Sequence, residues 1–491
     1  MTMIRKIFNS IFVSSALLMG LTSCDLTLYP NDAIPSDASW ETAKDAERFR
    51  TGIYSKLREV SGGKYEYTSD QQSDLFNSTI SYGNRGGEMQ RWDFTASQYD
   101  IEDFWQYNYY TIVNSNNIIE NIDKITPEDE DENKRLAIIK GEAFLMRAYC
   151  YHSLVLKFAK DYEPNTAASD LGLPIVLTFD TEARPSRSTL AETYAQIKSD
   201  ITSSRALLTT EGSPNSVYFT ADVIDLFEAR VDLCMHNFSN AVTLAEKVIG
   251  KYPLVNNAEA LSSMWLNDES SEILFRVFQS SDERMNSWAL YLNYNVGNSA
   301  FAPDYVPSKW ILDLYEPSDI RKNVYYLTSK ITCTDQSVTD VAMLNKYPGN
   351  PALKRTNPYE YYQMPKLFRS AEAYLIAAEA AFQSSNEPGA RSFLNGLREK
   401  RGASAITSSG NQLYEEIKKE WIREFIGEGK RIDCLKRWGD GLTRRDPQNE
   451  VILNVGAQYT SFSTGADNIR FVWEIPNNDL NANPNLVPNW K

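Results

Sequence analysis

Apolar residues recur every three or four positions over long stretches of this chain, which is the spacing that places them on one face of a helix. A first predicted helix begins after the capping residue Ser39 and ends at Gly62-Gly63. A second covers about residues 101–122 and a third about residues 134–158, each with an apolar face along its length. The N-terminal part of the body is therefore predicted to consist of long helices.

The same spacing predicts two helical hairpins, at about residues 220–250 and 367–401. In the first hairpin a short turn around His236 joins two helices, whose small residues, such as Ala229 and Ala241, let them approach closely. The second hairpin repeats this plan. The length of these units and the positions of their turn residues are typical of tetratricopeptide repeats, so a helical scaffold is predicted.

Two other regions, residues 61–100 and 279–307, do not fit helices and are rich in Gly, Asn, Ser and aromatic residues. Residues 272–278 and 469–475 have the composition of short strands. The predicted fold class is mainly α: a helical body over residues 39–491 with a loop-rich ligand-binding subdomain that has a few short strands. Loops carried by a rigid scaffold are often where function lies.

The first 23 residues have the pattern of a secretory signal peptide, with a positive pair before an apolar run that is too short for a stable membrane span. The sequence LTSC at residues 21–24 resembles a bacterial lipobox, in which Cys24 is lipidated and becomes the new N-terminus. An ordinary cleavage site beside a chance cysteine is the alternative. Several acyl chains on Cys24 would anchor the protein stably to a membrane. Residues 24–38 are then a tether without regular structure.

Composition narrows the possible functions. The 491 residues are 42% apolar, which is enough for a large core, and no apolar stretch after the N-terminus is long enough to span a membrane. A net charge of −15 repels the phosphate backbone of nucleic acids, so no nucleic-acid partner is expected. The five cysteines form no CxxC pair, and Cys150, Cys234 and Cys434 are predicted to be free buried thiols.

The sequence contains no recognisable motif of a catalytic or metal site. GxSxG is absent, and Glu424 occupies a position where a phosphate-binding loop would need glycine. The acidic run at residues 128–132 departs from a calcium-binding loop, and we interpret it as acids that favour a helix N-terminus. His152 is predicted to be a satisfied core residue, and His236 an exposed turn residue with no ligand spacing near it.

We therefore predict that the protein is not an enzyme and has no cofactor and no metal. A glycosidase stays an alternative, because 65 acidic residues leave a pair of catalytic carboxylates possible. With so many acids, however, the presence of a pair carries almost no weight.

Seven segments, in this order along the chain, resemble the SusD/RagB family of outer-membrane nutrient-binding lipoproteins. After the lipobox they are FWQYNYYTIVNSNNII, GEAFLMRAYCYHSLVLKF, YFTADVIDLFEARVDLCMHNFSNAVTLAEKVI, EILFRVF, LFRSAEAYLIAAEAAFQSSNEPGARSFLNGLREKRGA, KEWIREFIGEGKRIDCLKRWGD and WEIPNNDLNANPNL. The resemblance extends over nearly the whole mature chain. Ile432 departs from it, since the family has an aromatic residue after the arginine, and this affects only local packing.

The resemblance implies a mostly α-helical fold with tetratricopeptide-like repeats, attached by lipid to the outer membrane of a Gram-negative bacterium and facing the cell exterior. It also implies a partner, a SusC-like TonB-dependent transporter, over which the lipoprotein acts as a lid. Such a lid captures a nutrient glycan and performs no chemistry. Some family members capture peptides, so a peptide ligand is an alternative, and a purely structural protein that binds only the transporter is another.

Aromatic and polar side chains in the two loop-rich regions are the candidate ligand-binding residues. Sugar rings have apolar C–H faces and polar hydroxyl edges, so a site for them combines flat rings with Asp, Asn or Arg side chains. In the family that the chain resembles, ligand-contacting aromatics come from loops in these general regions. The predicted residues are Asp74, Tyr82, Arg85, Trp92, Trp288, Tyr291 and Tyr294. The alternative is that each aromatic residue packs its loop against the body, as we expect for the helical residues Trp105, Trp421 and Trp438.

Overall fold

The structure, a computed structural model, describes residues 39–79, 86–180, 182–285, 287–332, 338–452 and 461–490. The predicted signal peptide, Cys24 and the tether lie outside the described residues, and so do Tyr82 and Arg85. Helices dominate the residues that are described, and the strands among them are short. The prediction of a mainly α fold is therefore confirmed.

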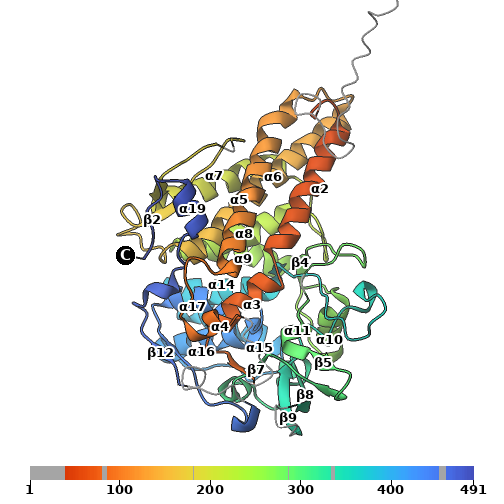
Figure 1. The fold of residues 1–491 in the computed structure, drawn as a ribbon, viewed down its shortest axis with the longest axis vertical. Coiled ribbons are helices and arrows are strands. Elements are labelled where there is room, and N and C mark those ends of the chain that lie inside the picture. The colour runs from red at the N-terminus through yellow and green to blue at the C-terminus, as the bar shows by residue number, and fades with distance from the viewer. Residues whose placement is uncertain are drawn as a thin grey trace, which may run out of the picture.

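Long helices form the N-terminal part of the body, where α2, α5 and α6 lie side by side (Figure 1) and α7 packs against α6. They are α2 (Ala43–Val60), α5 (Tyr99–Asn121), α6 (Glu130–Phe158) and α7 (Leu190–Leu207). The acidic run begins α6 as predicted: the Asp129 side chain accepts a hydrogen bond from the backbone N–H of Glu132. A capping box of Thr189 and Glu192 begins α7.

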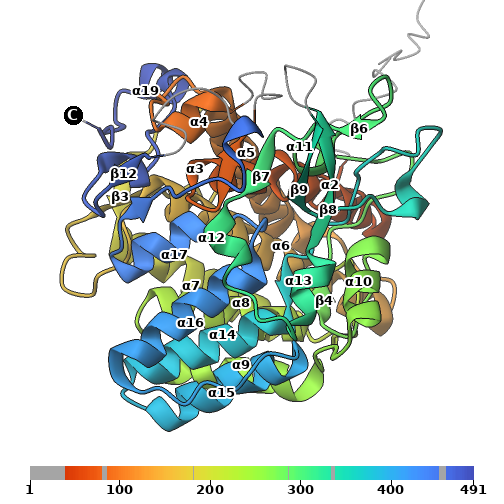
Figure 2. The same ribbon diagram turned by 90° about the horizontal axis from the view of Figure 1, so that it is seen from below.

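Both predicted hairpins are present, and their helices extend beyond the predicted ranges by at most one residue. They are α8 (Ala221–Cys234) with α9 (Phe238–Lys251), and α14 (Ser370–Gln383) with α15 (Glu387–Lys400). Helix α9 packs against α14, so the two hairpins form one block, and α16 (Gly410–Phe425) and α17 (Arg431–Trp438) follow them (Figure 2). The small residues Ala229, Ala241 and Ala377 are fully buried between these helices, which allows the close approach that the sequence predicts.

Residues 258–369 contain most of the strands. Helix α10 (Ala258–Asn267) precedes β4 (Ile273–Phe275), which pairs with β10 (Phe368–Arg369) in antiparallel fashion. A four-stranded sheet has the order β5-β6-β8-β9. The elements of this part are α11 (Ala289–Leu292), β5 (Tyr294–Asn295), β6 (Ala300–Phe301), β7 (Tyr305–Pro307), α12 (Lys309–Leu312), α13 (Ile320–Val324), β8 (Tyr326–Thr332), β9 (Val338–Leu344) and the 3-10 turn η2 (Pro351–Leu353).

Two predictions for the irregular parts are wrong. Residues 61–100, expected to be loop, contain α3 (Lys64–Gln72), β1 (Phe76–Ser78) and α4 (Gly87–Arg91). Helix α3 was not predicted because its buried residues include polar ones, so it has no continuous apolar face. The strand expected at residues 469–475 is instead the 3-10 turn η4 (Ile469–Phe471), which the Asn468 side chain caps by accepting a hydrogen bond from the Arg470 N–H.

The remaining short elements connect these parts. They are η1 (Ile122–Lys124), β2 (Leu171–Pro174), β3 (Arg187–Thr189), β11 (Leu442–Thr443), η3 (Glu450–Ile452), β12 (Ser463–Thr464) and α19 (Asn477–Ala482). Strand β2 pairs with β3, and β11 with β12.

Two main hydrophobic clusters stabilise the body, one among the helices and one around the strands of residues 258–369. Cys150, Cys234 and Cys434 are free and buried, as predicted. His152 is buried as predicted, but its Nε2 has no hydrogen-bond partner among the described residues, so it is not satisfied. Ile432 is buried in a small cluster with Trp92 and Phe471.

Candidate functional site

The two regions predicted to bind ligand are joined to each other by β1 and β7. These strands pair in antiparallel fashion, with Phe76 opposite Pro307 and Ser78 opposite Tyr305. The pairing continues one residue further, because the Thr79 N–H donates to the Asp304 carbonyl at 2.9 Å. Tyr82 and Arg85 follow Thr79 in the sequence and lie outside the described residues.

Trp288 lies in the interior and is fully buried, with an exposed fraction of 0%. Its indole stacks on Tyr347 with ring centroids 3.8 Å apart and planes within 5°, and Tyr67 meets it edge-on. Its backbone N–H donates to the Tyr361 carbonyl at 3.0 Å. This placement corrects the expectation that Trp288 presents a ring to a ligand, because the ring has no exposed surface in this structure.

Tyr291 and Asp74 are also buried and serve as links between segments. The Tyr291 hydroxyl donates to Oδ2 of Asp70 at 3.2 Å, and its ring stacks on Phe76. Asp74 accepts two hydrogen bonds of 2.8 Å from the Arg431 guanidinium. Burial raises the pKa of Asp70 to about 7, although the Gly429 N–H and Tyr291 act in the opposite direction. Tyr291 and Asp74 therefore hold the loops in place and are not part of the exposed loop surface.

Trp92 is buried on the other side of the first loop-rich region. Its Nε1–H donates to the Gln72 carbonyl at 2.7 Å, and Phe471 meets its ring edge-on at 4.8 Å. Like Trp288, it packs its loop against the body, which was the alternative to ligand binding. Trp105 and Trp421 are buried on their helices, as expected.

Tyr294 is the predicted ligand residue, among those described, that keeps some access to the surface. It is half-buried, and it stacks on Tyr359 with ring centroids 4.1 Å apart and planes within 17°. Tyr359 is 38% exposed, and Phe301 meets Tyr294 edge-on at 5.1 Å. We call Tyr294, Phe301 and Tyr359 the tyrosine platform. It lies at the β5–β6 hairpin and consists of the stacked pair Tyr294–Tyr359 with Phe301 nearly perpendicular to Tyr294.

The sequence prediction missed Tyr359. Its signal is the aromatic run Pro358-Tyr359-Glu360-Tyr361-Tyr362, which lies outside both predicted regions. Polar side chains hold this run in place: Glu360 accepts hydrogen bonds from the Arg284 guanidinium at 2.8 Å and from the Arg355 N–H at 2.7 Å. A charged residue that is bound by two arginines therefore follows Tyr359 directly in the sequence.

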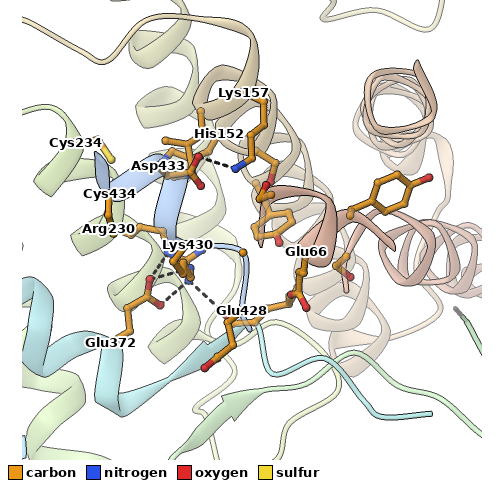
Figure 3. Close-up of a pocket in the computed structure, with 18 of the residues that line it drawn as sticks. Glu66, His152, Lys157, Arg230, Cys234, Glu372, Glu428, Lys430, Asp433 and Cys434 are labelled. Carbon is orange, nitrogen blue, oxygen red and sulfur yellow. Dashed lines mark hydrogen bonds and ion pairs between the residues drawn. The ribbon is translucent and has the colours of Figure 1, made fainter. Parts of the chain in front are cut away.

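A charged cavity of about 140 Å³ lies where α3, α6, α8, α14 and α17 meet. Figure 3 shows its carboxylates and cations facing one another. Glu372 pairs with Arg230 at 2.7 Å and with Lys430 at 3.2 Å, and Lys157 pairs with Asp433 at 2.6 Å. The volume suffices for roughly ten water molecules, which is too little for a sugar chain.

The groups around this cavity have shifted pKa values. Burial, together with Glu428, raises the pKa of Glu66 to about 8. Burial would also raise the pKa of Glu372, but Arg230 and Lys430 outweigh it and lower that pKa to about 2. Burial lowers the pKa of His152 well below its usual value. At neutral pH Glu66 is therefore largely protonated and His152 neutral, so the cavity holds paired charges that join five helices.

An open groove of about 560 Å³ lies between α5, residues 174–180 and 182–185, and α19. Trp105 and Tyr109 form part of its wall, and Tyr110 and Phe179 are 52% and 48% exposed. The loop that closes it is tied to α5, because the Tyr109 hydroxyl donates to the Pro174 carbonyl at 2.9 Å. This groove could not be predicted from the sequence, since its walls come from three separate segments.

Comparison with known proteins identifies relatives along the whole chain. Residues 33–222 match a family described as starch-binding and associating with the outer membrane, SusD-like, and residues 209–490 match the SusD family. A SusD-like protein, P38, from Formosa agariphila is 22% identical over 99% of both chains.

Solved structures have the same fold. A SusD superfamily protein from Bacteroides thetaiotaomicron has a TM-score of 0.79 and 26% identity, with 92% of this chain and 100% of that chain covered. A SusD-like carbohydrate binding protein from Bacteroides vulgatus has a TM-score of 0.74 over 91% of this chain and 98% of that chain. Its identity of 21% supports the fold alone.

Proposed function

Because this chain belongs to the SusD family, we propose that it is a cell-surface lipoprotein that binds a nutrient glycan and delivers it to a SusC-like TonB-dependent transporter. The proposal that the protein binds a glycan rests on the tyrosine platform. The N-terminal part of the chain matches a family whose description names starch binding. A polysaccharide is therefore the first ligand class to test.

The platform has the features that a sugar ring needs. The stacked rings of Tyr294 and Tyr359 hold each other in place, so little side-chain freedom is lost when a sugar C–H face packs on the exposed part of Tyr359. Asn295, which is exposed on the same hairpin, offers an amide to hydroxyl groups. Tyr82 and Arg85 follow the β1 edge that pairs with β7, and we keep both as candidate contacts.

The expected affinity is modest. Each well-placed aromatic contact contributes ~0.5–1.5 kcal/mol beyond its buried area. A few such contacts with hydrogen bonds, less the ordering cost, correspond to a dissociation constant between about micromolar and millimolar. Weak binding suits a protein that must also release its cargo to a transporter.

Calorimetric titration of the purified protein against polysaccharides, oligosaccharides and peptides tests the ligand class. We expect saturable binding of a glycan, and about a tenfold loss of affinity in Tyr359→Ala from one lost stacking contact. Tyr110→Ala is the matched control, because it removes an exposed tyrosine in the groove on α5. Peptide binding without glycan binding would favour the peptide alternative. No binding at all would favour a protein that contacts only its transporter.

The lipid anchor and the transporter are tested separately. None of the described helices is long and apolar enough to cross a membrane. We expect that Cys24→Ala moves the protein from the membrane fraction to the soluble fraction, and retention on the membrane would contradict the lipid assignment. A lid must seal the mouth of a barrel over a large interface, so the transporter should copurify with this protein in mild detergent.

A further inference from the structure

Three potential metal ligands from separate parts of the chain meet beside the first hairpin. Asp161 and Glu163 lie in the loop that follows α6, and His236 lies in the turn between α8 and α9. One ligand atom from each residue, an imidazole nitrogen or a carboxylate oxygen, lies within 4.8 Å of the other two. This proximity could not be predicted from sequence, because no short spacing connects the histidine to the two acids.

The three residues are held in place by other contacts. The Glu163 carbonyl accepts hydrogen bonds from the N–H groups of Thr166 and Ala167, which fixes the loop. The His236 ring stacks on Phe238 with centroids 5.3 Å apart, and its backbone is left-handed, with φ of 62°. The donors therefore approach each other from two fixed backbone segments.

One oxygen of this group lacks a partner that a cation would supply. Asp161 Oδ2 is buried and has no hydrogen-bond partner among the described residues. Two cationic side chains whose charges act on Asp161 are engaged elsewhere: Lys436 donates to the carbonyls of Leu156 and Ala159, and Arg437 pairs with Glu379. Their positive charge weakens cation binding, so we expect an affinity in the micromolar range instead of the nanomolar range.

The donor set also selects the kind of ion. One imidazole nitrogen and two carboxylate oxygens suit zinc and similar divalent transition metals, whereas calcium prefers oxygen ligands only. Ligand atoms of a tetrahedral zinc site lie about 3.4 Å apart, which is inside the 4.8 Å within which these three ligand atoms lie. Glu163 is exposed, so water has access to the group as a further ligand.

We propose that Asp161, Glu163 and His236 bind one divalent transition-metal ion of the zinc class. The ion would tie the loop after α6 to the turn of the first hairpin, with water completing its coordination. This site is independent of glycan binding, since its three ligands belong to other segments than the tyrosine platform and the groove.

Titration of the chelator-treated full protein with zinc chloride tests the proposal. We expect one equivalent to bind with a dissociation constant on the order of micromolar, and calcium chloride to bind at least tenfold more weakly. Asp161→Asn and His236→Asn should each weaken zinc binding at least tenfold. Asparagine is chosen at position 236 because it tolerates a left-handed backbone. Glu211→Gln, which changes an exposed acid, is the control and should bind zinc like the wild type.

Thermal unfolding separates metal binding from folding. Zinc should raise the Tm of the wild type and of Glu211→Gln, and leave that of His236→Asn unchanged, while the variants melt alike without metal. Absence of a zinc effect on the wild type would overturn the proposal. So would equal zinc binding by His236→Asn, or calcium binding that is tighter than zinc binding.

Discussion

The interior of the helical hairpins and the interior of the strand-containing part are filled by different side chains. Between α8, α9 and α14 the buried residues are mostly small or aliphatic, such as Ala241, Ala377 and Leu375. Around the strands many large rings lie among the aliphatic residues, with Trp288 stacked on Tyr347 and Lys346 4.4 Å from the centroid of Trp265. Regular helices approach closely over small residues, whereas irregular backbone leaves wider spaces that rings fill.

This difference explains why aromatic richness alone is a poor guide to a ligand site. Trp92, Trp288 and Tyr291 lie in regions rich in aromatic and polar residues, yet all three are buried. The tyrosine platform differs from them in one respect, which is that part of its surface remains exposed. The buried rings pack the loops against the body, and the exposed part of Tyr359 is the surface that we propose as a ligand contact.

The largest effect is expected when a buried ring of the strand-containing part is removed. Trp288→Ala should lower the free energy of unfolding by ~3–5 kcal/mol, because it deletes a fully buried indole and leaves a cavity. Denaturation in guanidinium chloride measures this loss. Tyr359→Ala, in which the deleted ring is partly exposed, is the matched control and should cost less than about 1 kcal/mol. Equal losses in the two variants would contradict the distinction between buried and exposed rings.

In the helical part, enlarging a buried side chain should lower the stability of the protein. Ala377→Leu adds a large side chain where α14 is closely packed, so it should destabilise the protein by about 1–3 kcal/mol. The same denaturation measurement applies. Ala206→Leu places leucine at an exposed position of α7 and should change stability by less than about 0.5 kcal/mol. If Ala377→Leu behaves like this control, the hairpins are not packed as closely as described.

A smaller, pH-dependent effect is expected at the charged cavity. The pKa of Glu66 is about 8 in the folded protein, compared with 4.5 for an ordinary glutamate in the unfolded chain. The free energy of unfolding therefore falls as the pH rises from 4.5 to 8. Glu66→Gln should therefore be more stable than the wild type at pH 9, and this gain should vanish near pH 4. Urea denaturation at several pH values measures it. Glu59→Gln, which makes the same change at a more exposed position, is the control variant.

The sequence predicted the long helices well because their apolar spacing is a local signal. The predicted ranges 101–122 and 134–158 differ from α5 and α6 by only a few residues at their ends. Burial in the irregular parts was not predictable in this way. Trp288 is buried through contacts with Tyr347 and Tyr361, and these long-range neighbours cannot be inferred from a window around the residue.

The same limit applies to the proposed sites. Tyr294 was found because it lies in an aromatic loop, but its partner Tyr359 is far along the chain. His236 was set aside because no acid lies at ligand spacing from it, although folding brings Asp161 and Glu163 beside it. Candidate residues within one segment can be predicted from its composition and the spacing of its apolar residues. A site that is assembled from several segments can be recognised only when the fold is known.

The central claim is that the exposed tyrosine platform, and not the buried rings or the groove on α5, contacts the ligand. Hydrogen–deuterium exchange of the protein with and without a saturating bound glycan tests it directly. We predict slower exchange in residues 289–305 and 355–362 when the glycan is bound, with no change in residues 105–114. Slower exchange confined to residues 105–114 and 174–185 would contradict the claim and place the ligand in the groove.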